Sequence, residues 1–492
     1  MKKIIFLLTI AVLSSCSGFL ELYPETTLNE GNFYKSETEY ILLANGCYVP
    51  LRELQKVDHW VMAEMASDNT SFQYNTTTGE ASKAVMDEFI LTSDNVAYKT
   101  FWSTSYSGIN RCNKLLSEID RPEVIWVRPA SKDRCMGEAL FLRSLYYFNL
   151  VQQFGGVPIV TAPITSQEAK ETKRAKVDEV YNLIVSDLVS AITHFKVASA
   201  LEENGRANLG SATALLGKVY LTIHKYPEAE AMLKSVMDMG KYSLLPVYAN
   251  LFNPVSKDYK ETIFAVQYSE NSAELANRFI FYFAPWSSAG AITNRPAINI
   301  TGSGGWSQPT DDLINAFETG DIRKNVSIAY WTGKDWDGQI RPIPYIAKYK
   351  APQTAPDDRC GDNLPVLRYS DVLLMYAEVL NEQNRTGEAI QYVQQVRNRA
   401  GLTAPLTGFT KTTLTDLIAK ERQVEFCFEN QRYYDLKRTG KALAVLTAHG
   451  AREKAKKTFL YPNAYEMKES KLLAPIPAEQ ILINQLEQNP GY

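Results

Sequence analysis

The chain has 492 residues, a net charge of −3 and a sequence pI near 6. This length is enough to bury a large core, and the nearly balanced charge provides no broad basic surface, which argues against a nucleic-acid partner. The five cysteines after Cys16 are odd in number, far apart and never in a Cys-x-x-Cys pair, and the four histidines show no metal-ligand spacing. We therefore expect no zinc site, no disulfide framework and no cofactor.

The first sixteen residues are typical of a bacterial lipoprotein signal. Lys2 and Lys3 precede an apolar run over residues 4–12, and small residues lead into Cys16. The run is shorter than the roughly 20 apolar residues that a membrane-spanning helix needs. We predict that residues 1–15 are a signal peptide and that Cys16 is lipidated, whereas in a plain secretory signal this cysteine would be incidental. Acyl chains on Cys16 would hold the protein at a membrane surface.

Apolar periodicity and helix-ending signals predict a mainly α protein with inserted loops. One long helix, over residues 133–154, is expected to end at the following Gly155-Gly156-Val157-Pro158, which combines glycine's preference for helix ends with proline's missing donor. The other predicted helices cover residues 36–55, 101–119, 176–195, 310–317 and 412–438.

Two helix pairs, over residues 206–242 and 372–400, have the spacing of tetratricopeptide repeats. The strings are Leu216-Gly217-x-x-Tyr220 with Ala229-x-x-x-Leu233, and Tyr376-Ala377-x-x-Leu380 with Ala389-x-x-x-Val393. In the first pair Gly217 is expected to let the helices approach closely. In the second, Gly387 is expected to close the turn and Glu388 to favour the next helix's first turn. Such pairs stack, because one pair alone cannot bury its apolar face.

Residues 284–310 differ in composition from the helical segments. They contain three prolines and four glycines, which predict a loop. Four of the seven tryptophans lie between residues 286 and 336, whereas a core would spread them along the helices. We therefore expect an exposed aromatic platform in this region.

Several longer strings identify a resemblance to a known family. They include Phe19-Leu20-Glu21-x-x-Pro24, Gly137-Glu138-Ala139-Leu140-Phe141-Leu142-Arg143, Leu367-Arg368-Tyr369-x-Asp371, Glu421-Arg422-x-x-Glu425-Phe426 and Gln488-Asn489-Pro490-Gly491-Tyr492. Together they resemble the SusD/RagB family of outer-membrane nutrient-binding lipoproteins of Bacteroidetes, from Cys16 to the end of the chain. The resemblance implies a SusD-like fold with tetratricopeptide-like helix pairs, an N-terminal region over 16–255 and a C-terminal region over 256–492 with an aromatic insertion at about 279–350.

The same resemblance implies a function at the cell surface. A lipid-anchored member of this family would bind an oligosaccharide and deliver it to a partner SusC-like TonB-dependent transporter, on the outward side of the outer membrane. Some relatives bind peptides in the corresponding cleft, so an oligopeptide ligand stays open. A scaffold that binds protein partners on a concave surface is a further alternative.

Sugar rings present apolar C–H faces that aromatic rings can cover, while amides and charges bind the hydroxyls. The candidate aromatic contacts in the insertion and in the loop after Ser67-Asp68-Asn69 are Trp286, Trp306, Trp331, Trp336, Tyr330, Phe72 and Tyr74. The candidate polar contacts are Asn75, Asn294, Arg295, Gln308 and Asp337. Core packing is the alternative for each aromatic residue, especially Trp306, whose surrounding string resembles one found throughout the family.

An enzyme is the last alternative, and its best acid pair is Glu421 with Glu425. One helical turn separates them, so their Cβ atoms are roughly 6 Å apart, which suits a retaining glycosidase. However, Arg422, Arg432 and Asp435 nearby favour a buried ion-pair network. The sequence also lacks the common nucleophile, zinc-protease and phosphate-loop motifs. We therefore expect no catalytic activity.

Overall fold

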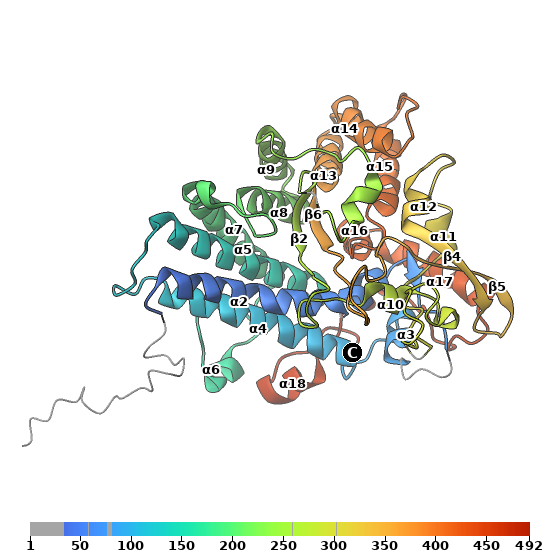
Figure 1. The fold of residues 1–492 in the computed structure, drawn as a ribbon, viewed down its shortest axis with the longest axis horizontal. Helices are drawn as coiled ribbons and strands as arrows, with labels where there is room; N and C mark the ends of the chain where they lie inside the picture. The colour runs from blue at the N-terminus through green and yellow to red at the C-terminus, as the bar shows by residue number, and fades with distance from the viewer. Residues whose placement is uncertain (1–33, 58, 76–80, 258, 302) are drawn as a thin grey trace, which may run out of the picture.

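The computed structural model describes residues 34–57, 59–75, 81–257, 259–301 and 303–492. The predicted signal peptide at residues 1–15 and Cys16 lie outside these described residues. Helices dominate the fold, as predicted (Figure 1). Within the described ranges, no helix is both long enough and apolar enough to cross a membrane.

Four long helices form the N-terminal side of the molecule (Figure 1). They are α2 (Glu37–Lys56), α4 (Val96–Glu118), α5 (Pro129–Phe154) and α7 (Val177–Val197). Helix α5 is buried along most of its length, because α2, α4 and α7 all pack against it. It ends before Gly155, whose φ of 73° continues the chain in a conformation that favours glycine. The four helices predicted between residues 36 and 195 are therefore confirmed.

The two predicted repeat pairs stack on each other. They consist of α8 (Leu209–Thr222) with α9 (Tyr226–Asp238), and α13 (Tyr369–Glu382) with α14 (Thr386–Arg399). Helix α9 packs against α13 although 130 residues separate the two in sequence (Figure 1). A Cβ atom on Gly217 would lie 2.8 Å from a side-chain carbon of Leu233, so the close approach of α8 and α9 requires this glycine.

Two sequence-based details of the second half are wrong. Gly387 lies inside α14, and the turn before that helix is instead closed by Asn384, which has a φ of 64°. The predicted helix at 412–438 is divided into α15 (Lys411–Glu425) and α16 (Arg432–Arg438). The break forms because the buried Glu64 carboxylate accepts the backbone N–H groups of Phe428 and Asn430, at 2.9 and 3.0 Å.

The described residues also form three two-stranded antiparallel sheets that the sequence analysis did not predict. The pairs are β1 (Thr70–Ser71) with β3 (Gln308–Pro309), β2 (Thr262–Val266) with β6 (Leu364–Arg368), and β4 (Ile328–Lys334) with β5 (Ile340–Ile346). Strand β5 contains Pro342 and Pro344, which argue against a strand when read from sequence. Because these prolines are two residues apart, both can occupy positions whose missing N–H would face away from β4.

Short helical segments connect these elements. They are η2 (Trp60–Glu64), α3 (Ala81–Asp87), α6 (Ser166–Glu171), η3 (Ser199–Leu201), η4 (Tyr248–Phe252), α10 (Phe279–Phe283), η5 (Trp286–Ser288), α11 (Asp311–Ile314), α12 (Arg323–Ser327), α17 (Ala442–Lys456), η6 (Glu469–Leu472) and α18 (Ala478–Asn484).

The largest hydrophobic core contains residues from both sides of position 255. The division of the chain at that position stays a prediction.

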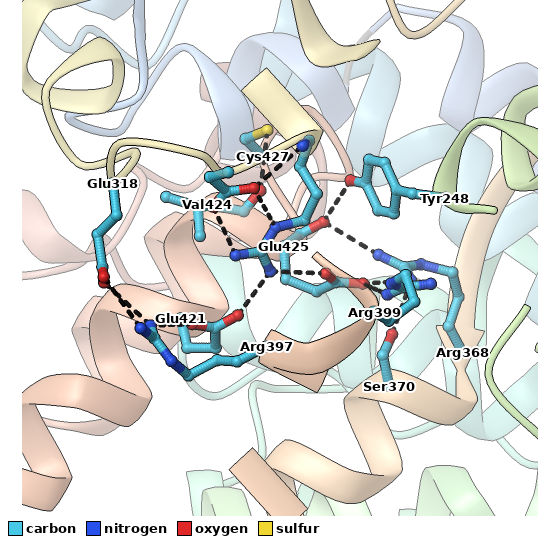
Figure 2. Close-up of polar contacts among 12 residues, drawn as sticks. Tyr248, Glu318, Arg368, Ser370, Arg397, Arg399, Glu421, Val424, Glu425 and Cys427 are labelled. Carbon is cyan, nitrogen blue, oxygen red and sulfur yellow. Dashed lines mark hydrogen bonds and ion pairs between the residues drawn. The ribbon is translucent and has the colours of Figure 1, made fainter. Parts of the chain in front are cut away.

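A buried network of charges joins the insertion to the repeat scaffold. Glu425, on α15, accepts hydrogen bonds from Arg399, Arg368 and Arg323, with N to O distances of 2.5, 2.8 and 2.9 Å. Glu421, one turn earlier, binds Arg323 at 2.6 Å and Arg397 at 3.1 Å. Figure 2 shows Arg397 beside Glu421, and Arg368 and Arg399 beside Glu425. These arginines come from α12, β6 and the end of α14.

Because these charges are buried away from water, the loss of any one partner destabilises the whole network. Burial by itself raises the pKa of a carboxyl group, but the charges of Arg399, Arg368 and Arg323 hold the pKa of Glu425 well below its ordinary value. Removing one partner from a buried ion pair leaves an uncompensated charge in a medium of low dielectric constant.

We predict that Glu425→Gln lowers the free energy of unfolding by about 3 to 5 kcal/mol, because three guanidinium groups lose their shared anion. Chemical denaturation followed by circular dichroism measures this change. Glu388→Gln is the matched control, since Glu388 pairs with Arg385 at the surface, and it should leave stability nearly unchanged. Equal denaturation midpoints for wild type and Glu425→Gln would contradict the role given to the network.

Candidate ligand-binding face

Three segments that are far apart in sequence meet at one end of the molecule. They are the loop after β1, the turn of the β4–β5 hairpin and the segment after α17, and they lie at the same side of the molecule as α3 (Figure 1). Lys457 Nζ donates to Ser71 Oγ at 2.8 Å, which joins the end of α17 to β1. Gln73 Nε2 donates to Asp335 Oδ1 at 3.2 Å, which joins the loop after β1 to the hairpin turn.

Each of these segments contributes one half-exposed ring to an aromatic triad, Tyr74, Phe459 and Trp336. The rings of Tyr74 and Phe459 are stacked, with centroids 4.2 Å apart and planes 18° apart. Trp336 contacts Phe459 in an edge arrangement, with centroids 4.9 Å apart and planes 64° apart. Both arrangements are favoured by the charge distribution of aromatic rings. Of the four clustered tryptophans, Trp336 belongs to this triad, and the exposed aromatic platform expected in that region stays a prediction.

Gln73 is buried and links the loops of this face through hydrogen bonds. Its side chain is 2% exposed, its backbone N–H donates to Gly305 O at 2.9 Å, and its Oε1 accepts from the backbone of Trp286 at 3.3 Å. A Cβ atom on Gly305 would lie 2.6 Å from Oε1 of Gln73, and Gly305 has a φ of 85°, so glycine is required there. Gln73 therefore fixes the positions of Trp286 and of the hairpin turn relative to Tyr74.

Alternate residues of β4 face opposite sides of the hairpin. Tyr330 is 52% exposed on the outer side, whereas Trp331 lies half-buried on the side of η5. A Cβ atom on Gly333 would come within 2.3 Å of Trp331 Nε1 and 2.8 Å of Ser287 Oγ, so this glycine makes room for the indole. Trp286, at the start of η5, is also half-buried. The sequence analysis grouped Tyr330 with Trp331, but they cannot contact one ligand ring together.

Two of the predicted aromatic contacts are core residues. Phe72 and Trp306 are each 4% exposed, so the expectation of an exposed ring is wrong for both. Trp306 stacks on Tyr282, with centroids 4.2 Å apart and planes 4° apart, and Lys83 Nζ lies 4.1 Å from the centroid of its indole. The packing role considered for Trp306 in the sequence analysis is therefore confirmed.

Three of the five predicted polar residues, Arg295, Asn75 and Asp337, have side-chain partners in the structure. Arg295 donates through Nε to Ala355 O at 2.9 Å and through Nη2 to Pro352 O at 3.1 Å, which ties its loop to the segment before β6. Asn294 is exposed, with a φ of 55°. Asn75 donates to Thr301 O at 2.6 Å. Of the remaining two, Gln308 lies opposite Ser71 in the β1–β3 pair, and Asp337 pairs with Arg341 in the hairpin turn.

Sequence reasoning missed Phe459 and Gln73. Phe459 follows a helix rich in lysine and alanine, about 120 residues from Trp336, and no motif links the two segments. The run Thr458-Phe459-Leu460-Tyr461-Pro462 places two aromatic residues in a loop, and this is the sequence feature that could have indicated Phe459 as a site residue. Gln73 was not among the predicted contacts, because the partners of a buried amide cannot be read from sequence.

Two acidic residues near this face, Asp87 and Glu88, have raised pKa values. Asp87, at the end of α3, accepts the backbone N–H of Phe72 at 2.9 Å. Burial raises the pKa of Asp87 to about 6 in spite of the nearby charge of Lys457. Burial, together with the charge of Asp87, raises the pKa of Glu88 to about 7. The segment leading to Tyr74 is thus held by the Asp87 carboxyl group, whose pKa is about 6, whereas Glu88 accepts the backbone N–H of Tyr461 in the segment after α17.

The acid pair considered for catalysis lies away from this face and is inaccessible. Glu421 and Glu425 are 2% and 0% exposed, so no substrate can reach them in this structure. The ion-pair interpretation is confirmed. Arg422 pairs with Asp435 at 2.9 Å and with Asp371 at 2.7 Å, and Arg432 pairs with Asp68. Glu421 and Glu425 are neutralised by the arginines of the network described above and not by Arg422 or Arg432. Within the described part of the chain, no group of side chains has the arrangement of a metal site.

Comparisons with known proteins match both ends of the chain to families. Residues 343–492 match a model described as the SusD family, and residues 19–221 match a model described as starch-binding and associating with the outer membrane. The chain is also similar to the SusD-like protein P25 of Formosa agariphila. The two are 25% identical, over 98% of this chain and 96% of that protein.

Solved structures share the fold over nearly the whole chain. A laminarin-binding SusD-like protein is 26% identical and superposes with a TM-score of 0.74, over 93% of this chain and 100% of the other. The surface glycan-binding protein A of Bacteroides thetaiotaomicron, in complex with laminarihexaose, is 21% identical with a TM-score of 0.75, over 92% and 99% of the two chains. The second comparison shows likeness of fold alone.

We predict that Asp87→Asn flattens the dependence of stability on pH. The folded pKa of Asp87, about 6, lies above the ordinary value of 3.8, so the folded state binds more protons than the unfolded state between about pH 4 and pH 6. Stability therefore falls as pH rises through this window. Asparagine can still accept the N–H of Phe72 but does not ionise, so the variant should be more stable at pH 7.5 by at most about 3 kcal/mol.

Thermal unfolding of wild type and Asp87→Asn at several pH values measures the effect. The two melting temperatures should converge near pH 4 and separate as pH rises. Parallel curves across the range would contradict the assignment of a raised pKa to Asp87.

Proposed function

We propose, because the chain belongs to the SusD family, that it binds an oligosaccharide at the bacterial outer membrane and delivers it to a SusC-like TonB-dependent transporter. The aromatic triad is the single observation that carries this proposal. Three rings from three separate segments are partly exposed together, although exposed rings are usually scattered. The laminarin-binding relative supports a glycan as the ligand class.

The chemistry of the triad suits a sugar chain. The C–H faces of pyranose rings are apolar and can cover the faces of Tyr74 and Trp336, removing both surfaces from water at roughly 25 cal/mol per Å². Around the triad, Asp335, Asp337 and Arg341 offer polar groups to hydroxyls. The indole N–H groups of Trp286 and Trp331 are buried, so they do not serve as donors to a ligand on this surface.

We predict that Trp336→Ala and Tyr74→Ala each weaken oligosaccharide binding about tenfold, because losing a ring face of ~60 Å² costs ~1.5 kcal/mol. Calorimetric titration with a panel of oligosaccharides and a mixed oligopeptide pool measures this. Tyr226→Ala is the matched control, since Tyr226 is a half-buried tyrosine on α9, within the repeat scaffold.

Two outcomes would count against this site. Sugar binding that both variants leave unchanged would place the ligand elsewhere on the molecule. Saturable binding of peptides alone would favour the oligopeptide alternative.

We also propose that Cys16 is lipidated and anchors the chain to the outward face of the outer membrane. In native membranes the wild type should incorporate labelled fatty acid, sediment with membranes and copurify with a TonB-dependent transporter, whereas Cys16→Ala should be unlabelled and soluble. Membrane retention of unlabelled Cys16→Ala would contradict the anchor. Absence of a transporter from the purified wild type would contradict delivery.

A further inference from the structure

A second cavity lies away from the aromatic triad, between α2, β2 and the loop before α8. It is an open cleft with a volume of about 250 Å³, which suits a small ligand. Its apolar surface comes from Leu51, Phe264 and Val266, and its polar surface includes Arg52 and Arg206. None of the residues that line it belongs to the ligand-binding face described above.

The guanidinium of Arg52 lacks the polar partners that the other described arginines have. Among the arginines in the part of the chain that the structure describes, only Arg52 neither donates a hydrogen bond nor forms an ion pair, and its Nε is buried without a partner. By contrast, Arg206 on the same cavity is fully engaged, with Nε donating to Glu138 at 2.8 Å and Nη1 to Asn45 at 2.5 Å. The Nε atom of Arg52 has no exposed area, so the two Nη groups, which have no protein acceptor, are the donors that can reach a ligand in the cavity.

The acidic residues nearest to the cavity are already neutralised. Glu138 is held by Arg206, and Glu203 pairs with Arg134 at 2.5 Å. Glu53, next to Arg52 in α2, pairs with Lys56 at 3.0 Å. The described side chains around the cavity therefore leave one positive charge without a counterion, at the wall where Arg52 lies.

We infer that this cavity binds a small organic carboxylate. The carboxylate accepts hydrogen bonds from the two Nη groups of Arg52, a paired geometry in which a guanidinium binds planar anions. The body of the ligand covers Leu51, Phe264 and Val266, and the exposed amide of Asn204 reaches its rim. This site is independent of the proposed oligosaccharide function.

Titration of the full chain tests the inference, with glucuronate and benzoate as carboxylate probes and glucose as the uncharged counterpart of glucuronate. At least one carboxylate should bind saturably, and glucose should not bind at this site. Arg52→Gln should weaken binding about 10- to 100-fold, because a charge-assisted hydrogen-bonding pair is lost. Arg52→Lys should bind with intermediate affinity, since it keeps the charge but not the fork of donors.

Arg111→Gln is the control, because Arg111 is an arginine on the adjacent α4 that donates only to Gly46 O. Among the described residues the Arg52 side chain makes no hydrogen bond or ion pair, so the melting temperatures of its variants should stay close to that of wild type. Trp336→Ala should bind the carboxylate normally, which separates this test from the oligosaccharide proposal. Failure of both carboxylates to bind saturably, equal binding of glucose through Arg52, or undiminished binding by Arg52→Gln would each overturn the inference.

Discussion

The buried charge network around Glu425 is the constraint on which the rest of the structure depends. It holds both ends of the β4–β5 hairpin to the repeat scaffold. Arg323, five residues before β4, binds Glu421 and Glu425, and Lys348, two residues after β5, binds Glu429 at 2.9 Å and Cys427 O at 2.7 Å. Because these charges are desolvated, no partial set of partners is stable. The hairpin that presents Trp336 is therefore fixed by electrostatics at its base, while its turn projects from the scaffold.

The proposed ligand-binding face depends on a second set of contacts at the other end of the hairpin. Gln73 binds the hairpin turn and η5, Lys457 joins α17 to β1, and Asp87 holds the N–H that precedes Gln73. Each of these side chains is polar and mostly buried, so its hydrogen bonds are costly to lose. The rings of Tyr74, Phe459 and Trp336 can remain partly exposed because these polar contacts, and not the rings, determine where the loops lie.

Periodicity in the sequence predicted the helices well, because each long helix buries one continuous apolar stripe that leaves a regular pattern. The role of Gly217 could also be predicted, because the helices α8 and α9 that it allows to approach are adjacent in sequence. The strands and the break between α15 and α16 could not be predicted, since β5 contains prolines and the break depends on Glu64, more than 350 residues away. Tryptophan clustering could not separate Trp306, which stacks in the core, from Trp336, which is partly exposed. Phe459 joins the triad through tertiary contact alone.

The most direct test of this account is a crystal structure of the protein with the oligosaccharide that it binds most tightly. We expect sugar rings in van der Waals contact with Trp336 and Tyr74, and a hairpin and Gln73 that keep their positions relative to the unliganded protein. An oligosaccharide bound at another surface, with Tyr74, Phe459 and Trp336 uncovered, would contradict the central claim that these three segments are assembled to form the ligand-binding site.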